Sequence, residues 1–234
     1  MPAQPGVKAA MNSNFLLLLQ ITDPYFPIGA YTQSFGLETY VQKGLVRDGE
    51  TARQYLTGKL ENSFLYNELL GMRLAYEYAA KRELGLILEL NELYGASTVP
   101  AELKKAGMNL GRGFFRMAET YGGRMDLLRA CQEAENVNYC LAFGIFCAEN
   151  GIPFPEAALA FTYSQASAMI NNLAKLLPLS QTEGQAILFQ TGDLISRLAR
   201  EVTALTAGDL GRSTIGFEIR SMQHERLYTR MYSS

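Results

Sequence analysis

Apolar residues recur at helical spacing along most of the chain, and no run shows the alternation typical of a β-strand. The clearest series is Leu56, Leu60 and Phe64, which Leu70 and Leu74 continue after a slip in the spacing. The pattern predicts an all-α fold, a single-domain helical bundle of roughly eight to ten helices. The predicted helices span residues 13–22, 34–43, 50–81, 83–94, 100–121, 126–150 (broken near 136–138), 155–177, 180–205 and 214–232.

Local signals set several of these boundaries. Ser180 and Glu183 form a Ser-x-x-Glu capping box, which predicts a helix start. Pro155 is placed for a first helical turn, where its missing N–H costs nothing. Gly95 predicts a helix stop. Gly71, inside the long helix, predicts close packing or a bend.

One stretch, residues 23–38, follows neither the helical nor the strand period. Pro24 and Pro27 fix φ there, and Gly29 and Gly36 allow conformations closed to other residues. The stretch is nevertheless rich in apolar and aromatic side chains, namely Tyr25, Phe26, Ile28, Tyr31, Phe35 and Leu37. We therefore expect a loop that either packs against the core or receives a partner. Thr32 or Ser34 would cap the short helix after it, with Glu38 in its first turns.

Composition narrows the class of protein. Hydrophobic residues make up 48% and charged residues 19% of the 234 positions, as in an ordinary globular chain. A net charge of −2 gives no sign of the large basic surface that is typical of a nucleic-acid-binding protein. Three cysteines form no disulfide framework, no signal peptide is recognisable, and no apolar run is long enough to span a membrane. We expect a cytoplasmic protein with a flexible N-terminal tail at residues 1–12 and one all-α domain at 13–234.

Catalytic chemistry finds little support in the residues. His224 is the only histidine, and Tyr228 stands where a zinc protease would need its second histidine. His224 is therefore interpreted as a hydrogen-bonded helical residue or as a partner contact. Cys140 and Cys147 lie roughly 10 Å apart along one helix, too far to bind one metal ion, so buried thiols are expected at both and at Cys131.

No nucleotide-binding loop is present either. Gly111-Arg112-Gly113 falls within a predicted helix and cannot form a phosphate nest. Arg112 and Arg116 lie four residues apart on one helical face, which is compatible with an arginine finger or with a solvated, salt-bridged surface. No cofactor is expected, and the chain is not predicted to be an enzyme.

Four motifs, in order along residues 13–234, resemble those of the urease accessory protein family UreF. They are Pro27-x-Gly29-Ala30-Tyr31 with Ser34-x-Gly36-Leu37-Glu38, Gly111-Arg112-Gly113-Phe114-Phe115-Arg116-Met117-Ala118 with Ala142-Phe143-Gly144, Pro178-Leu179-Ser180-Gln181-Thr182-Glu183-Gly184-Gln185, and Met222-x-His224-Glu225-x-x-Tyr228-x-Arg230. The chain departs from the family where Asn138 replaces a histidine and Cys140 a proline. A metal role of that histidine does not transfer to this chain.

The resemblance implies a non-enzymatic adaptor in urease maturation. Such proteins form a homodimer that bridges UreD (also called UreH) and the GTPase UreG, gates GTP hydrolysis, and helps to deliver nickel to apo-urease. No nucleic acid or membrane is implied as a partner. The expected contacts with UreD lie in the 23–38 loop and in a docking segment at 214–234. The partner-binding residues are Tyr25, Pro27, Gly29, Tyr31, Ser34, Gly36, Glu38, Arg112, Arg220, Met222, His224, Glu225, Tyr228 and Arg230.

Two alternatives stay open at this point. The chain could activate the UreG GTPase by supplying Arg112 or Arg116 in trans. It could also be a helical regulator that binds a small ligand. The sequence leaves the dimer geometry, the nickel route and the UreG-binding face undecided.

Overall fold

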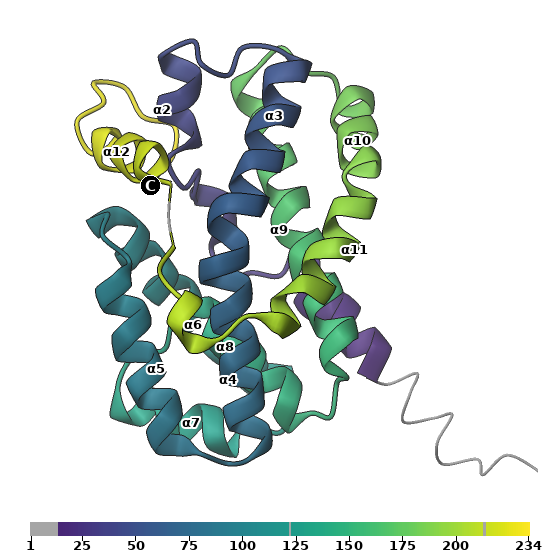
Figure 1. Ribbon diagram of the computed structural model, residues 1–234, viewed down its shortest axis with the longest axis vertical. Coiled ribbons are helices and arrows are strands. Elements are labelled where there is room, and N and C mark those ends of the chain that lie inside the picture. The colour runs from purple at the N-terminus through teal and green to yellow at the C-terminus, as the bar shows by residue number, and fades with distance from the viewer. Residues whose placement is uncertain (1–13, 122, 213) are drawn as a thin grey trace, which may run out of the picture.

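The computed structural model describes residues 14–121, 123–212 and 214–234, and this part of the chain consists of helices and the loops between them, without a strand (Figure 1). The all-α prediction is confirmed. Residues 14–21 are helical, and eleven α-helices follow among the described residues. With the 3-10 helices η1, η3 and η4 and the π-helix η2, the order of elements is η1 (Ala30–Thr32), α2 (Leu37–Gln42), α3 (Gly49–Lys59), η2 (Leu60–Leu69), α4 (Leu70–Ala80), α5 (Leu84–Ser97), α6 (Ala101–Tyr121), α7 (Asp126–Ala134), α8 (Tyr139–Glu149), α9 (Phe154–Leu176), α10 (Gln181–Gln190), α11 (Gly192–Glu201), η3 (Val202–Ala204), η4 (Ala207–Asp209) and α12 (Ile215–His224).

The predicted long helix is one continuous rod made of α3, η2 and α4. Leu56, Leu60, Phe64, Leu70 and Leu74 are all buried on it. The wider π turn of η2 lies where the apolar spacing slips, because a π turn takes more residues per turn than an α turn. The slip in the sequence is therefore the signature of a π-helical segment that keeps the apolar side chains on one face.

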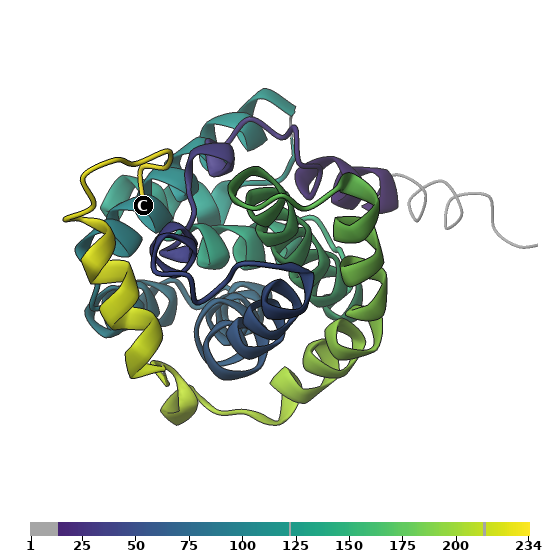
Figure 2. The ribbon, with the colours of Figure 1, turned by 90° about the horizontal axis from the view of Figure 1, so that it is seen from above.

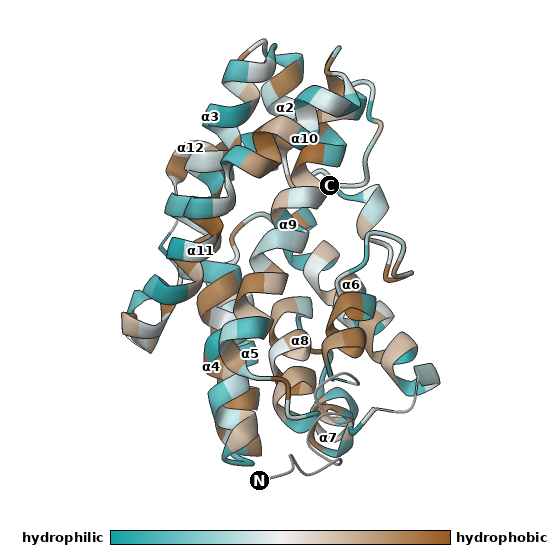
Figure 3. Cartoon of the chain, turned by 90° about the vertical axis from the view of Figure 1, so that its right-hand side faces the viewer, coloured by the Kyte–Doolittle hydropathy of each residue, from teal (hydrophilic) through white to brown (hydrophobic). Residues whose placement is uncertain are grey.

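The centre of the core is α8, whose residues from Tyr139 to Cys147 are all buried. Figure 3 shows apolar residues along α8 and on the neighbouring parts of α4 and α6. Gly144 allows α8 to lie directly on α4, since a Cβ atom there would clash with the main-chain oxygen of Met72. The Ala142-Phe143-Gly144 motif is thus a close-packing feature. None of the described helices is long and apolar enough to span a bilayer.

Several predicted boundaries are wrong. Helix α5 continues past Gly95 to Ser97, because an internal glycine weakens a helix without requiring it to end. The helix predicted at 180–205 is interrupted at Thr191, whose buried hydroxyl bonds to the main-chain oxygen of Ile187. The N-cap of α2 is Gly36 instead of Thr32 or Ser34. The tail expected at residues 1–12 lies outside the described residues.

The predicted helix at 214–232 ends early, at His224. The remaining residues, 225–234, which we call the tail, turn back over the N-terminal part of the chain. Figures 1 and 2 both show α12 beside α2, although the two helices lie almost 180 residues apart in the sequence. The C-terminal segment of the chain thus lies against α2 and the residues just before it.

Candidate functional site

The backbone at Gly36 brings α12 against the 23–38 loop. Gly36 has a φ of +83°, a left-handed conformation that glycine adopts without strain. A Cβ atom at this position would also clash with the side chain of Ser221 on α12. Gly36 is therefore required twice, once for its conformation and once for the close approach of α12. The Ser-x-Gly-Leu-Glu motif therefore forms the surface against which α12 packs.

Four side chains meet next to this contact between α2 and α12, and we call them the junction: Glu38, Glu102, His224 and Arg230. His224 is fully buried, with Nδ1 at 2.7 Å from Glu102 Oε2 and Nε2 at 3.1 Å from Glu38 Oε2. Arg230 donates to the other oxygen of Glu102 over 2.7 Å. Elements α2, α6, α12 and the tail each contribute one of these side chains. The N-terminal and C-terminal motifs are therefore two parts of one polar cluster.

The tail is fixed to the same cluster by its backbone. The N–H groups of Met231 and Tyr232 donate to Glu38 over 2.8 and 3.1 Å. Ser34 N–H donates to the main-chain oxygen of Ser234 over 2.8 Å. Burial, with smaller contributions from Tyr31 and Glu38, raises the pKa of Tyr232 to about 12. The tail is thus anchored by hydrogen bonds, of which those to the Glu38 carboxylate are strengthened by its charge.

The outer side of α12 differs from its inner side. Phe217, Ser221 and His224 are buried, but three apolar residues on the opposite side are exposed, and we call them the docking face: Ile215, Ile219 and Met222. Their spacing of four and three residues places them on one helical face. Tyr228 and Met231 in the tail are exposed as well. An ordered helix that presents an apolar face to solvent is typical of a protein-binding surface.

The structure divides the predicted partner-binding residues into two groups. Nine are exposed: Tyr25, Pro27, Gly29, Tyr31, Arg112, Met222, Glu225, Tyr228 and Arg230. Arg220 is half-buried, and Ser34, Gly36, Glu38 and His224 are buried in the contact between loop and tail. Of the two interpretations of His224, the structure shows the hydrogen-bonded helical residue. The buried four shape the surface from within, and a partner would reach them only if the tail moved.

The glycines around Arg112 are structural. A Cβ atom at Gly111 would clash with the main-chain oxygen of Val137, and one at Gly113 would meet the main-chain oxygen of Ile28 at 2.6 Å. Arg112 and Arg116 point away from these contacts and are exposed. Exposure is a requirement for an arginine finger, but a solvated helix face shares it. The close contacts explain the motif without any role in nucleotide chemistry.

The cysteines are buried and carry no metal-binding geometry. Burial raises the pKa of Cys131 to about 12 and also raises the pKa values of Cys140 and Cys147. Thiolates bind metals and thiols do not. Among the described residues, no group of three or more histidine, cysteine, aspartate or glutamate side chains is arranged to hold a metal ion. The two nitrogens of His224 are each occupied by a different carboxylate.

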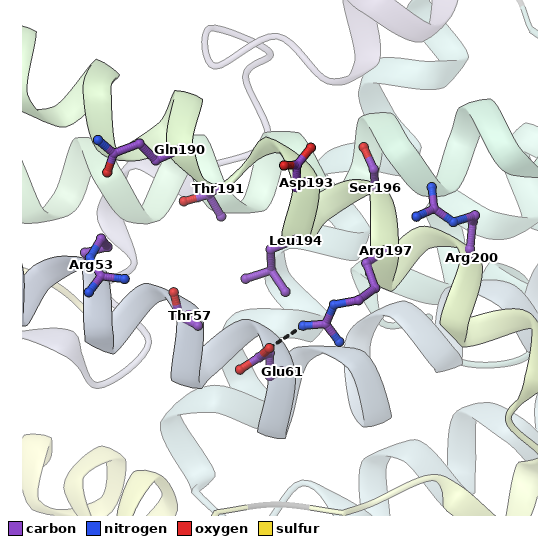
Figure 4. Close-up of a pocket in the computed structure, with 10 residues that line it drawn as sticks. All are labelled: Arg53, Thr57, Glu61, Gln190, Thr191, Asp193, Leu194, Ser196, Arg197 and Arg200. Carbon is purple, nitrogen blue, oxygen red and sulfur yellow. Dashed lines mark hydrogen bonds and ion pairs between the residues drawn. The ribbon is translucent and has the colours of Figure 1, made fainter.

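A surface hollow lies away from the junction, between the α3–η2 rod and α10–α11 (Figure 4). It has a volume of about 870 Å³ and is lined mainly by polar side chains. Arg197 spans it to pair with Glu61, and Arg53 pairs with Glu50. Two of the three arginines that line the hollow, Arg53 and Arg197, are thus paired with carboxylates of the chain itself.

Sequence reasoning missed Glu102, the residue that completes the junction. It stands in the first turn of α6, where an acidic residue is already favourable for the helix, so it carried no separate signal. Lys59 was also missed. Its ammonium group is buried below α12, 3.8 Å from the ring centroid of Phe217 and 2.9 Å from Ser63. Burial lowers the pKa of Lys59. The contact of Glu102 with His224 and the contact of Lys59 with Phe217 both depend on the position of α12.

Comparison with known proteins agrees with these motifs. The family model UreF matches residues 46–192, more than half of the chain. The chain belongs to the UreF family. It is 32% identical over 222 residues to a urease accessory protein UreF of Actinobacillus pleuropneumoniae serotype 3, covering 93% of this chain and 97% of the relative. The UreF of Nostoc sp. PCC 7120 is also 32% identical over 222 residues, covering 94% and 96%.

A UreF of Bacillus sp. TB-90 is 29% identical over 226 residues, covering 95% of this chain and 100% of the relative. The likeness therefore extends well beyond the residues that the family model matches. UreF proteins carry the name of accessory proteins and not of enzymes, so membership of the family makes this chain a non-enzymatic protein.

Proposed function

We propose that the chain is an adaptor in urease maturation that binds UreD (UreH) and the GTPase UreG, and through them supports nickel insertion into apo-urease. Membership of the UreF family gives the process. The observation that carries the adaptor role is the docking face, an exposed apolar stripe on a helix whose other side is fixed by the junction. A preformed face loses little conformational freedom when a partner covers it.

UreD is the partner that we assign to the docking face and to the exposed tyrosines of the 23–38 loop. Tyr25 and Tyr31 are largely exposed, and Lys175 lies 3.4 Å from the ring centroid of Tyr31. Tyrosine and methionine are enriched in protein interfaces, where they combine apolar area with polar edges. Binding of UreD would then precede capture of UreG and gating of its GTP hydrolysis.

A second apolar surface supports a homodimer. Phe15, Leu16 and Leu19 are exposed on the helix at residues 14–21, and Leu159 and Tyr163 are exposed on α9. Asn14 donates to the main-chain oxygen of Gly151, which brings the first helix beside the start of α9. Monomeric proteins rarely expose contiguous apolar patches of this kind. The three buried thiols suit a reducing cytoplasm, in which we place the protein.

The docking face can be tested by the substitution Met222→Asp. Because Met222 is exposed, we expect unchanged thermal unfolding but a loss of UreD affinity of about thirtyfold or more, which corresponds to about 2 kcal/mol for a residue central to an interface. Size-exclusion chromatography with light scattering and calorimetric titration measure the two quantities. Leu86→Asp, at an exposed position of α5, is the matched control.

Two results would contradict the proposal. A wild-type chain that forms no complex with UreD would remove the adaptor role. A Met222→Asp variant that binds UreD as tightly as the wild type would place the docking face elsewhere.

A further inference from the structure

The contacts of His224 determine how many protons the junction holds. Each ring nitrogen faces a carboxylate oxygen, Glu102 at 2.7 Å and Glu38 at 3.1 Å. A neutral imidazole has one N–H and presents a lone pair at its other nitrogen. That lone pair would repel the ionised carboxylate it faces. The closed junction therefore needs one additional proton, held between the imidazole and the two carboxylates.

The charges around the junction support this count. Glu38 comes from α2, Glu102 from α6 and Arg230 from the tail, while Glu38 also accepts two main-chain N–H groups. With the proton, the two carboxylates are balanced by the imidazolium and by the guanidinium of Arg230. Without the proton, a net negative charge remains beside a fully buried side chain, where charge is poorly solvated.

Other charged and titratable groups nearby do not replace the proton. Arg220 on α12 donates to Gln223, and Lys175 on α9 lies over the ring of Tyr31. Tyr232 stays a neutral phenol at physiological pH because its pKa is raised. Lys59 is bound to Ser63 and Glu68 and lies against Phe217, near the start of α12. The balance of the junction thus depends on its own four side chains.

We propose that the junction is a proton-held latch that keeps α12 and the tail closed and so orders the docking face. The inference rests on the proposed function, because it states when the UreD-binding surface is formed. In the open state, His224 would be an ordinary exposed histidine, a side chain that is mostly neutral above about pH 6.5. Closing therefore takes up a proton above that pH, and opening releases it.

The sign of the pH dependence follows from this proton count. Above about pH 6.5 the closed state binds one proton more than the open state, so rising pH favours opening, by about tenfold per pH unit for one proton. Between about pH 4.5 and 6.5 both states hold the proton and the equilibrium is flat. The slope continues upward in pH as long as the closed junction keeps its proton.

Hydrogen exchange of the unmodified chain alone tests the latch. The amides of Met231 and Tyr232, which donate to Glu38, and the amides of α12 report on opening once intrinsic exchange rates are corrected for pH. We expect their protection factors to be flat from pH 5 to 6.5 and to fall about tenfold per unit above. Amides of α8 serve as the internal reference. Protection of the tail that does not change with pH would overturn the inference.

Two variants identify the proton. Glu102→Gln offers the imidazole an amide N–H in place of a carboxylate, so the closed junction no longer needs the extra proton; we expect the tail to stay protected and the fall in protection above pH 6.5 to disappear. His224→Gln removes the titrating ring, and we expect lower protection with no slope. A wild-type slope in either variant would overturn the proposal.

The latch and the adaptor role fail separately. The exchange experiment uses the chain without a partner, so it gives the same slope whether or not UreD binds. The Met222→Asp titration is made at one pH and depends on the docking face and not on the proton. A flat exchange profile with intact UreD binding would remove the latch alone.

Discussion

Helices α8 and α12 are of similar length but are held in place by different interactions. Every residue of α8 from Tyr139 to Cys147 is buried, and most of them belong to the hydrophobic core. Only Phe217, Ser221 and His224 are buried on α12. The first helix is held by apolar area removed from water, and the second by a few buried polar contacts to α2, α6 and the tail.

The difference shows how one chain combines a rigid frame with a releasable surface. Apolar burial around α8 is insensitive to proton binding and spread over many residues. The contacts of α12 are few and depend on the charge of the groups that make them. Regions of few buried apolar contacts open locally at lower free energy than the core. A binding surface placed on α12 can therefore change without loss of the bundle.

The largest effect on stability should come from adding a single methyl group where α8 packs on α4. In Gly144→Ala the added Cβ would clash with the main-chain oxygen of Met72, and backbone on α4 cannot move aside as a side chain can. We expect the free energy of unfolding to fall by about 1–3 kcal/mol or more. Urea denaturation measures it.

Gly58→Ala on α3 is the matched control, because a Cβ atom there meets nothing within 4 Å. We expect this variant to be more stable by about 0.5–1 kcal/mol, the gain of alanine over glycine in a helix. A neutral Gly144→Ala would mean that α8 does not lie as closely on α4 as described.

A smaller and local effect is expected at the junction. Glu102→Ala removes the acceptor of both His224 and Arg230 and leaves a buried ring nitrogen unsatisfied, at a local cost of about 1–3 kcal/mol. Hydrogen exchange should show α12 and the tail opening more often while the amides of α8 keep their protection. Glu225→Ala, at an exposed position of the same segment, should change neither. Equal loss of protection in α8 and α12 would show that the two regions are not independent.

Many of the helix boundaries were predictable because local residues determine them. The capping box at Ser180, Pro155 in a first turn and the break before α8 were read correctly from adjacent residues. The slip after Phe64 was visible as well, although its cause, a π-helical segment, needed the structure. These features depend on contacts within a few residues along the chain.

The junction was only half predictable because its parts are far apart. The motifs marked Glu38 and His224 among the expected partner contacts, and His224 alternatively as a hydrogen-bonded residue, but gave no sign that the two meet each other across 186 residues. Glu102 gave no signal, and the break at Thr191 depends on a buried hydroxyl. Long-range pairing of polar side chains has no periodicity along the chain, so pattern alone does not reveal it.

The most direct test of the account is a double-mutant cycle between Glu38 and His224. Hydrogen exchange of the α12 amides gives the opening free energy of the wild type, Glu38→Gln, His224→Gln and the double variant at pH 6. The account places these residues in direct contact at one latch, so it predicts a coupling energy of about 1 kcal/mol or more. Effects that add within about 0.3–0.5 kcal/mol, as for distant and independent sites, would contradict it.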